Sequence, residues 1–181
     1  GGSMLRTDLN QVKSVVKQVE WVRDVDVRRR FPDTLEIHIE EHRPFARWQV
    51  AGADTESEQS LLVNSFGEVF EADADAEEKL PLLAGPAGSS REVMTQFAVL
   101  SKPLAALGPS LAELRLSPRR AWQMKLDNGS TIELGRHDAE LRLARFIQAY
   151  PRVPVLQAAN ARVDMRYQTG LAVRAVLAKP A

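Results

Sequence analysis

The sequence predicts an α+β fold in which one short helix and a β-hairpin precede a mostly antiparallel β domain with flanking helices. Three observations support this prediction. Apolar residues recur every three or four positions over 9–19, which indicates an amphipathic helix. They alternate with charged residues over 22–30 and again over 35–39, which is typical of strands. Farther along, Asn128-Gly129 stands between two alternating segments and is a strong hairpin signal.

The N-terminal part is expected to form the helix and the first hairpin. Residues 1–4 are typical of a linker or cloning remnant and are set apart from the fold. The helix is predicted to begin at Thr7-Asp8 and to end near Trp21. The two strands that follow are joined by a turn at Phe31-Pro32-Asp33. Pro44 then marks the expected boundary of the next domain.

The middle of the chain mixes short strands with irregular segments. A strand is expected after Pro44, and a second hairpin over 61–71. Residues 72–90 contain an acidic run followed by several prolines and glycines, which predicts a long irregular connection. Ser89 and Glu92 have the spacing of a capping box, so a helix is expected to begin there.

The C-terminal part predicts further antiparallel strands around one helix. The predicted strands span 111–117, 120–127, 130–134, 161–168 and 171–177. The helix over 138–150 has Leu143 on its core face and places Arg142 and Arg145 on its outer face. Thr169-Gly170 is the expected turn between the last two strands.

Composition excludes several classes of protein. The 181 residues contain no cysteine and carry 24 basic against 24 acidic side chains. A disulfide framework, a thiolate metal site and a cysteine nucleophile are therefore excluded. The zero formal charge argues against nucleic-acid binding, which depends on a basic excess. No apolar run approaches the roughly 18 residues that span a bilayer, so we expect a soluble chain whose membrane anchor, if it has one, lies upstream.

The groups that could carry catalysis or bind a metal each have a simpler explanation. Glu36, His38 and Glu40 share one strand face and could chelate a metal, but their spacing is typical of the solvated face of a half-buried strand. Arg28-Arg29-Arg30 could hold a phosphate, although a short basic run in a neutral chain is more often a solvated edge. Nucleophile elbows, His-Glu-x-x-His and glycine-rich phosphate loops do not occur. We expect no enzyme, no cofactor and no metal.

The segment 171–178 is the most informative stretch for function. It is strongly apolar, carries a single charge at Arg174 and has no proline before Pro180. Sheet edges are usually protected by charges or prolines, and this segment has little of either. Two interpretations stay open: a strand enclosed by two others, or an edge that accepts an extended segment of another chain.

Motifs along nearly the whole chain resemble those of the FtsQ family of bacterial cell-division proteins. The N-terminal match is VDVRRRFPDTLEI at 25–37, and it is followed by PFARW at 44–48. Later matches are LPLLAGP at 80–86, RAWQMKL at 120–126, RLARF at 142–146, VDMRY at 163–167 and GLAV at 170–173. The order and coverage of these segments are more specific than any one of them.

The resemblance implies an architecture and a role. It implies the C-terminal part of a POTRA domain over 5–43, with only the last helix and two strands of that domain visible, and an FtsQ-type β domain over 44–181. It further implies a non-enzymatic divisome scaffold on the periplasmic side of the inner membrane at the septum, anchored by a single span outside this chain. The implied partners are FtsB and FtsL in a ternary complex, together with other divisome proteins.

The resemblance also implies site residues. FtsB docks on the final strand of the family's β domain, beside an Arg-Tyr pair that corresponds to Arg166 and Tyr167. The implied partner-binding residues are Arg166, Tyr167, Thr169, Gly170, Leu171, Ala172, Val173, Arg174 and Ala175. Ala175 stands where some relatives carry tryptophan, so one aromatic group is absent from the expected docking face. Val27 and Arg29 mark a candidate face for recruitment to the division site.

Two other classes of protein remain as alternatives. A peptidoglycan hydrolase or carbohydrate-binding domain would need acidic residues clustered in a cleft, roughly 5–9.5 Å apart, whereas the acidic residues here are scattered over loops and outer faces. A POTRA module of outer-membrane assembly would repeat the POTRA pattern, and the C-terminal half does not repeat it.

Overall fold

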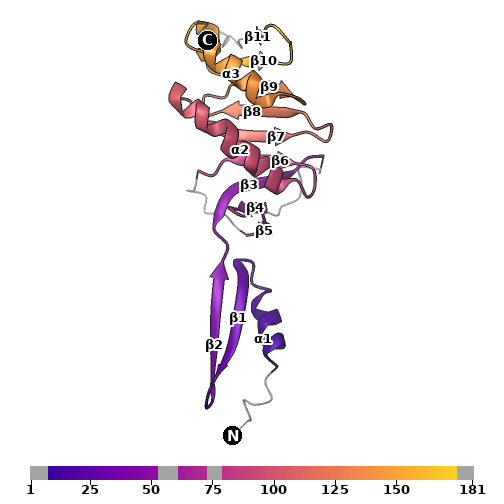
Figure 1. The fold of residues 1–181 in the computed structure, drawn as a ribbon, viewed down its shortest axis with the longest axis vertical. Coiled ribbons are helices and arrows are strands. Elements are labelled where there is room, and N and C mark those ends of the chain that lie inside the picture. Colours follow the sequence, from indigo (N-terminus) through magenta and orange to yellow (C-terminus); the bar gives the residue numbers. More distant parts are fainter. Residues whose placement is uncertain (1–7, 53–60, 73–78, 175–181) are drawn as a thin grey trace, which may run out of the picture.

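The computed structural model describes residues 8–52, 61–72 and 79–174, and in it the chain forms two units joined end to end (Figure 1). A helix and a two-stranded hairpin form the N-terminal unit, and a nine-stranded sheet with two longer helices forms the C-terminal unit. The α+β prediction is confirmed.

The N-terminal unit packs a short helix against one strand of a long hairpin. Helix α1 (Leu9–Val16) is capped by Asp8, whose carboxylate accepts a hydrogen bond from the Asn10 N–H at 2.9 Å. Strands β1 (Val22–Arg30) and β2 (Thr34–Glu41) pair antiparallel, and Val25 lies opposite Ile39. Val25 is fully buried and is the packing centre of this unit.

The expected helix end near Trp21 is wrong, because α1 ends at Val16. Beyond it the amides of Gln18 and Val19 bond to carbonyls three residues back, at 3.2 Å each. These tight turns reverse the chain so that β1 can run back along the helix.

The C-terminal unit is built on a mixed sheet in the order β11-β10-β9-β8-β7-β6-β3-β4-β5. Its strands are β3 (Pro44–Val50), β4 (Leu61–Asn64), β5 (Val69–Glu71), β6 (Leu82–Gly85), β7 (Leu111–Leu116), β8 (Trp122–Leu126), β9 (Thr131–Gly135), β10 (Arg162–Asp164) and β11 (Ala172–Arg174). Neighbouring strands are antiparallel except for the pairs β3–β6, β6–β7 and β9–β10, which are parallel. The expectation of mostly antiparallel strands is therefore correct.

Strand β6 is the main error of the sequence-based prediction. It lies inside the segment 72–90, which was expected to be irregular, and it pairs with β3 on one side and β7 on the other. The run Leu82-Leu83-Ala84-Gly85 does not alternate because both faces of this central strand are covered. A side chain at Gly85 would meet the Ser89 hydroxyl at 2.4 Å, so glycine is needed for this close approach.

Two helices cover one face of the sheet and enclose the core (Figure 1). Helix α2 (Ser90–Leu104) continues into a 3₁₀ turn, Ala105–Leu107, and α3 (Ala139–Ala149) is followed by a second, Pro154–Gln157. The expected capping box does not form: the Ser89 hydroxyl donates to the carbonyl of Pro86 at 2.6 Å instead of capping α2. The largest fully buried side chains include Leu83, Leu114, Met124, Ile132 and Phe146.

Candidate functional site

The strand expected to bind a partner lies at one end of the nine-stranded sheet. β11 pairs antiparallel with β10, with Val173 opposite Val163, and no other described strand lies on its outer side. β11 begins at 172, one residue after the expected start, and residues 175–177 of the expected strand, Ala175 included, lie outside the described residues. Val173 packs toward the core, whereas Ala172 and Arg174 are exposed on the opposite face.

The loop between β10 and β11 carries the expected Arg-Tyr pair. Both residues are exposed, and 58% of Tyr167 is accessible to solvent. Arg166 already has an acidic partner in its own chain, because Nε and Nη2 donate to the two oxygens of Asp164 at 2.9 and 2.6 Å. This pairing raises the pKa of Arg166 and lowers the pKa of Asp164. Thr169 and Gly170 are exposed in the same loop.

The open face of the sheet beside β11 is hollowed and carries charges of both signs. A depression of about 820 Å³ lies over β9, β10 and β11 on the face opposite the helices. Arg162, Arg166 and Arg174 bring three guanidinium groups to it, while Glu133 and Asp164 bring two carboxylates. Such a surface suits a partner segment that offers backbone groups and carboxylates.

Sequence reasoning placed Arg142 and Arg145 on the outer face of α3, and that placement is wrong. Nη1 of Arg142 donates to the carbonyl of Leu134, at the end of β9. The guanidinium of Arg145 donates to backbone carbonyls of the loop that carries Tyr167. The expected strand over 161–168 is also shorter in the structure, because β10 ends at Asp164 and the chain continues as the loop that Arg145 contacts. The one feature of the sequence that could have indicated these contacts is the spacing of the two arginines, three residues apart on one helix.

A second polar cluster joins the two units. We define the joint as Arg23, Glu40, His42, Asn64 and Glu68. Nε of Arg23 donates to Glu68 at 2.7 Å, and Nη1 donates to Glu40 at 2.6 Å, so one guanidinium bonds to a carboxylate in each unit. These contacts raise the pKa of Arg23 and lower the pKa of Glu68. The guanidinium also stacks over the ring of Phe66, 3.8 Å from its centre.

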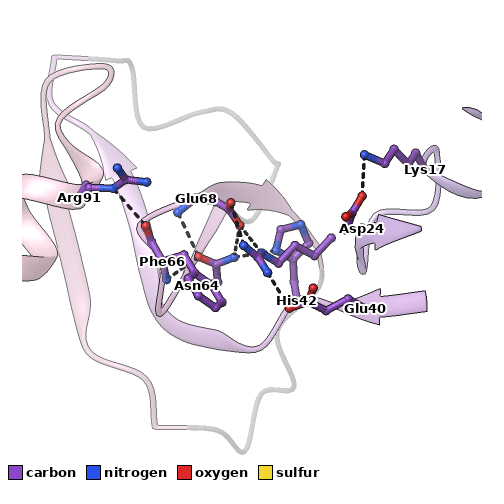
Figure 2. Close-up of polar contacts among 9 residues, drawn as sticks. Lys17, Asp24, Glu40, His42, Asn64, Phe66, Glu68 and Arg91 are labelled. Carbon is purple, nitrogen blue, oxygen red and sulfur yellow. Dashed lines mark hydrogen bonds and ion pairs between the residues drawn. The ribbon is translucent and has the colours of Figure 1, made fainter. Parts of the chain in front are cut away.

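Asn64 organises the centre of the joint (Figure 2). Its carbonyl oxygen accepts hydrogen bonds from the amides of Phe66 and Glu68, at 2.9 and 3.0 Å. Its amide group donates to the Glu68 carboxylate at 2.7 Å and contacts Nδ1 of His42 at 3.0 Å. A single buried side chain therefore shapes the β4–β5 turn and connects that turn to the residue that follows β2.

Aromatic side chains pack against His42 on one side of the joint. The His42 ring stacks on Phe70 with centroids 4.1 Å apart, and Trp21 meets the same ring edge-on at 5.7 Å. Burial lowers the pKa of His42, while the charges of Glu68 and Arg23 act on it in opposite directions. Neutral imidazole is thereby favoured, with Nδ1 free to accept the hydrogen bond from Asn64. No sequence motif indicated these contacts, because their residues lie far apart along the chain.

The remaining candidates are surface features of the hairpin. His38 lies 3.3 Å from Glu36, and in the described ranges no three histidine, cysteine or acidic residues gather as a metal site would require. Val27 is half-buried and Arg29 is exposed, two positions apart on β1 and therefore on one face. Over the residues described, no helix is long and apolar enough to cross a membrane.

The chain is similar over nearly its whole length to known cell-division proteins. Residues 46–166 match the family described as cell division protein FtsQ/DivIB, C-terminal, and residues 1–42 match the POTRA domain, FtsQ-type. Cell division protein FtsQ of Nitrosospira multiformis is 39% identical over 96% of this chain and 70% of its own length. The FtsQ proteins of Shewanella oneidensis and Escherichia coli are 38% and 33% identical, over 94% and 95% of this chain. This chain spans 62% of the length of each of those two.

Proposed function

Because the chain belongs to the FtsQ family of non-enzymatic bacterial cell-division proteins, we propose that it holds FtsB, and through FtsB also FtsL, at the forming septum. The binding site is the outer edge of β11, and the complex forms on the periplasmic side of the inner membrane. Residues 5–43 act as the C-terminal part of a POTRA domain and residues 44–181 as the β domain that binds the partner. Val27 and Arg29 belong to the recruitment face.

One observation supports this proposal most: β11 ends the sheet beside an exposed Arg-Tyr pair. An edge strand presents unpaired N–H and C=O groups, which an extended segment of another chain can continue as a further strand. Backbone pairing sets the register of such a contact, while exposed aromatic side chains that become buried supply much of its affinity. Tyr167 supports the proposal because it lies in the loop that leads into β11 and is 58% accessible to solvent.

Calorimetric titration with the periplasmic region of FtsB tests the proposal. Tyr167→Ala should weaken binding by about 2 kcal/mol or more, as the loss of a buried aromatic anchor does. Phe31→Ala is the matched control, since Phe31 is 95% exposed in the turn between β1 and β2. That hairpin lies far from β11 (Figure 1). The control should bind like the wild type. Equal effects of both substitutions, or no effect of Tyr167→Ala, would refute the site.

A further inference from the structure

The guanidinium of Arg145 connects helix α3 to the loop that carries the Arg-Tyr pair. Nη1 donates to the carbonyl of Gln168 at 2.6 Å, and Nη2 donates to the carbonyls of Tyr167 and Met165 at 3.1 and 3.3 Å. One planar group therefore gathers three backbone oxygens from four consecutive residues. Charge-assisted bonds from a fork of fixed geometry restrict a loop more than single neutral bonds do.

The helix that presents Arg145 is itself firmly placed. Leu143 and Phe146 on either side of it are almost completely buried in the core. Arg142, one turn earlier, bonds in the same way to the carbonyl of Leu134 at the end of β9. A side chain at Gly135 would lie 2.5 Å from the Arg142 guanidinium, so glycine leaves the room that this guanidinium occupies. The two arginines extend from a rigid element over the ends of two neighbouring strands.

The backbone contacts decide which groups of the loop face the solvent. The carbonyls of Met165, Tyr167 and Gln168 point toward the guanidinium, while the side chains of Arg166 and Tyr167 are exposed. Nε of Arg145 is buried and has no hydrogen-bond partner in the described structure, so part of this guanidinium is desolvated without compensation.

We propose that Arg145 is a positioning residue for partner binding, which holds the loop 165–168 so that Tyr167 and Arg166 are presented before the partner arrives. The inference rests on the proposed function, because it concerns the same site. Without Arg145 the loop samples other arrangements, and the apparent dissociation constant equals the intrinsic one divided by the fraction of time that the competent arrangement is populated. If that fraction is about one tenth, binding weakens about tenfold.

The variants are Arg145→Gln and Arg145→Lys, with Arg152→Gln as control. Glutamine keeps one donor group, lysine keeps the charge without the fork, and Arg152 is an exposed arginine just beyond the end of α3. Binding of the periplasmic region of FtsB is followed by surface plasmon resonance, and amide exchange of 166–171 is measured on the free proteins. A thermal melt accompanies each variant.

Arg145→Gln should lower the association rate about tenfold with little change in the dissociation rate, because fewer free molecules are ready to bind. The amides of 166–171 should exchange faster, Arg145→Lys should restore part of the rate, and the control should match the wild type. A role limited to stability would lower the melting temperature and leave the association rate of the folded protein unchanged. That result, or unchanged exchange in the loop, overturns the proposal.

Tyr167→Ala, measured in parallel, separates the two proposals. If Tyr167→Ala weakens binding and both Arg145 variants bind like the wild type, the site stands and the positioning role is wrong. If Tyr167→Ala has no effect, the proposed site itself fails. If Arg145→Gln does not fold, the association rate of Arg145→Lys and the amide exchange of its residues 166–171 test the positioning role instead, since lysine keeps the helix propensity and the charge.

Discussion

Asn64→Ala should destabilise the protein far more than a typical surface substitution. The side chain is 1% exposed and takes part in four hydrogen bonds. Two of them hold the β4–β5 turn through the amides of Phe66 and Glu68. The other two connect that turn to His42 and to the Glu68 carboxylate, and so support the joint between the two units.

The size of the effect follows from these contacts. An intramolecular hydrogen bond contributes about 1 kcal/mol net, so four would contribute about 4 kcal/mol. His42 and the Glu68 carboxylate are only half-buried and can turn to water, which reduces their share. The expected loss in free energy of unfolding is therefore about 3 kcal/mol.

Two further variants separate the turn from the joint. Asn128→Ala removes a side chain that accepts one hydrogen bond in the described structure, from the Ser130 amide at 3.0 Å, and should cost about 1 kcal/mol in free energy of unfolding. Asn64→Asp keeps the acceptor for both turn amides, loses both donated bonds and places a second carboxylate beside Glu68. It should preserve the turn and loosen the joint.

Urea denaturation gives the free energies, and a spin-label distance reports the joint. The chain contains no cysteine, so single cysteines at exposed Asp33 and Arg119 can be labelled selectively. Both Asn64 variants should broaden the distance distribution between these labels. A loss for Asn64→Ala no larger than that for Asn128→Ala, together with an unchanged distribution, would refute this account of the joint.

Three further predictions concern the joint and the partner edge. Burial lowers the pKa of His42 below its usual 6.5, so below about pH 6.5 the unfolded chain binds more protons than the folded one. The free energy of unfolding should therefore be lower at about pH 5 than at about pH 8 in urea titrations, and His42→Gln should remove this difference. Proline at Val173 should have a different effect from proline at Ala172 or Arg174, because alternate amides of an edge strand face outward. Proline at an outward-facing amide should abolish FtsB binding in a folded protein, whereas proline at an inward-facing amide should damage the sheet. Normal binding by every folded variant would contradict strand addition. Arg166→Ala should weaken binding less than Tyr167→Ala, with an effect that fades as salt rises, and a salt-independent loss would argue against an exposed ion pair with the partner.

The parts of the fold that depend on local patterns could be predicted from the sequence. Alternation over 22–30 and 35–39 predicted β1 and β2, which pair as an antiparallel hairpin. Only Val25 of that apolar face is fully buried, while Ile37 and Ile39 remain 42% and 52% exposed. The same rule missed β6, since Leu82–Gly85 is covered on both faces and has no alternation to detect. Flanking prolines at 81 and 86 then made it resemble a loop.

The final strand could be predicted from the sequence, but its neighbours could not. The apolar final segment indicated β11 and left open whether it is enclosed or at an edge, and among the described strands it is the last of the sheet. The ion pair between Arg166 and Asp164 could have been suspected from their spacing, whereas the reach of Arg145 to Gln168 depends on how α3 docks. The joint likewise unites residues of β1 with those of the β4–β5 turn, 45 positions apart in the case of Arg23 and Glu68.

Amide hydrogen exchange of β11, measured with and without the periplasmic region of FtsB, decides whether the partner adds a strand at this edge. Strand addition requires that the outward-facing amides within Ala172–Arg174 gain protection when FtsB binds, while strands at the opposite edge, such as β5, remain unchanged. For strand addition we expect slower exchange confined to β11 and its adjoining loop. Tight binding of FtsB with no change in the exchange of Ala172–Arg174 would contradict it.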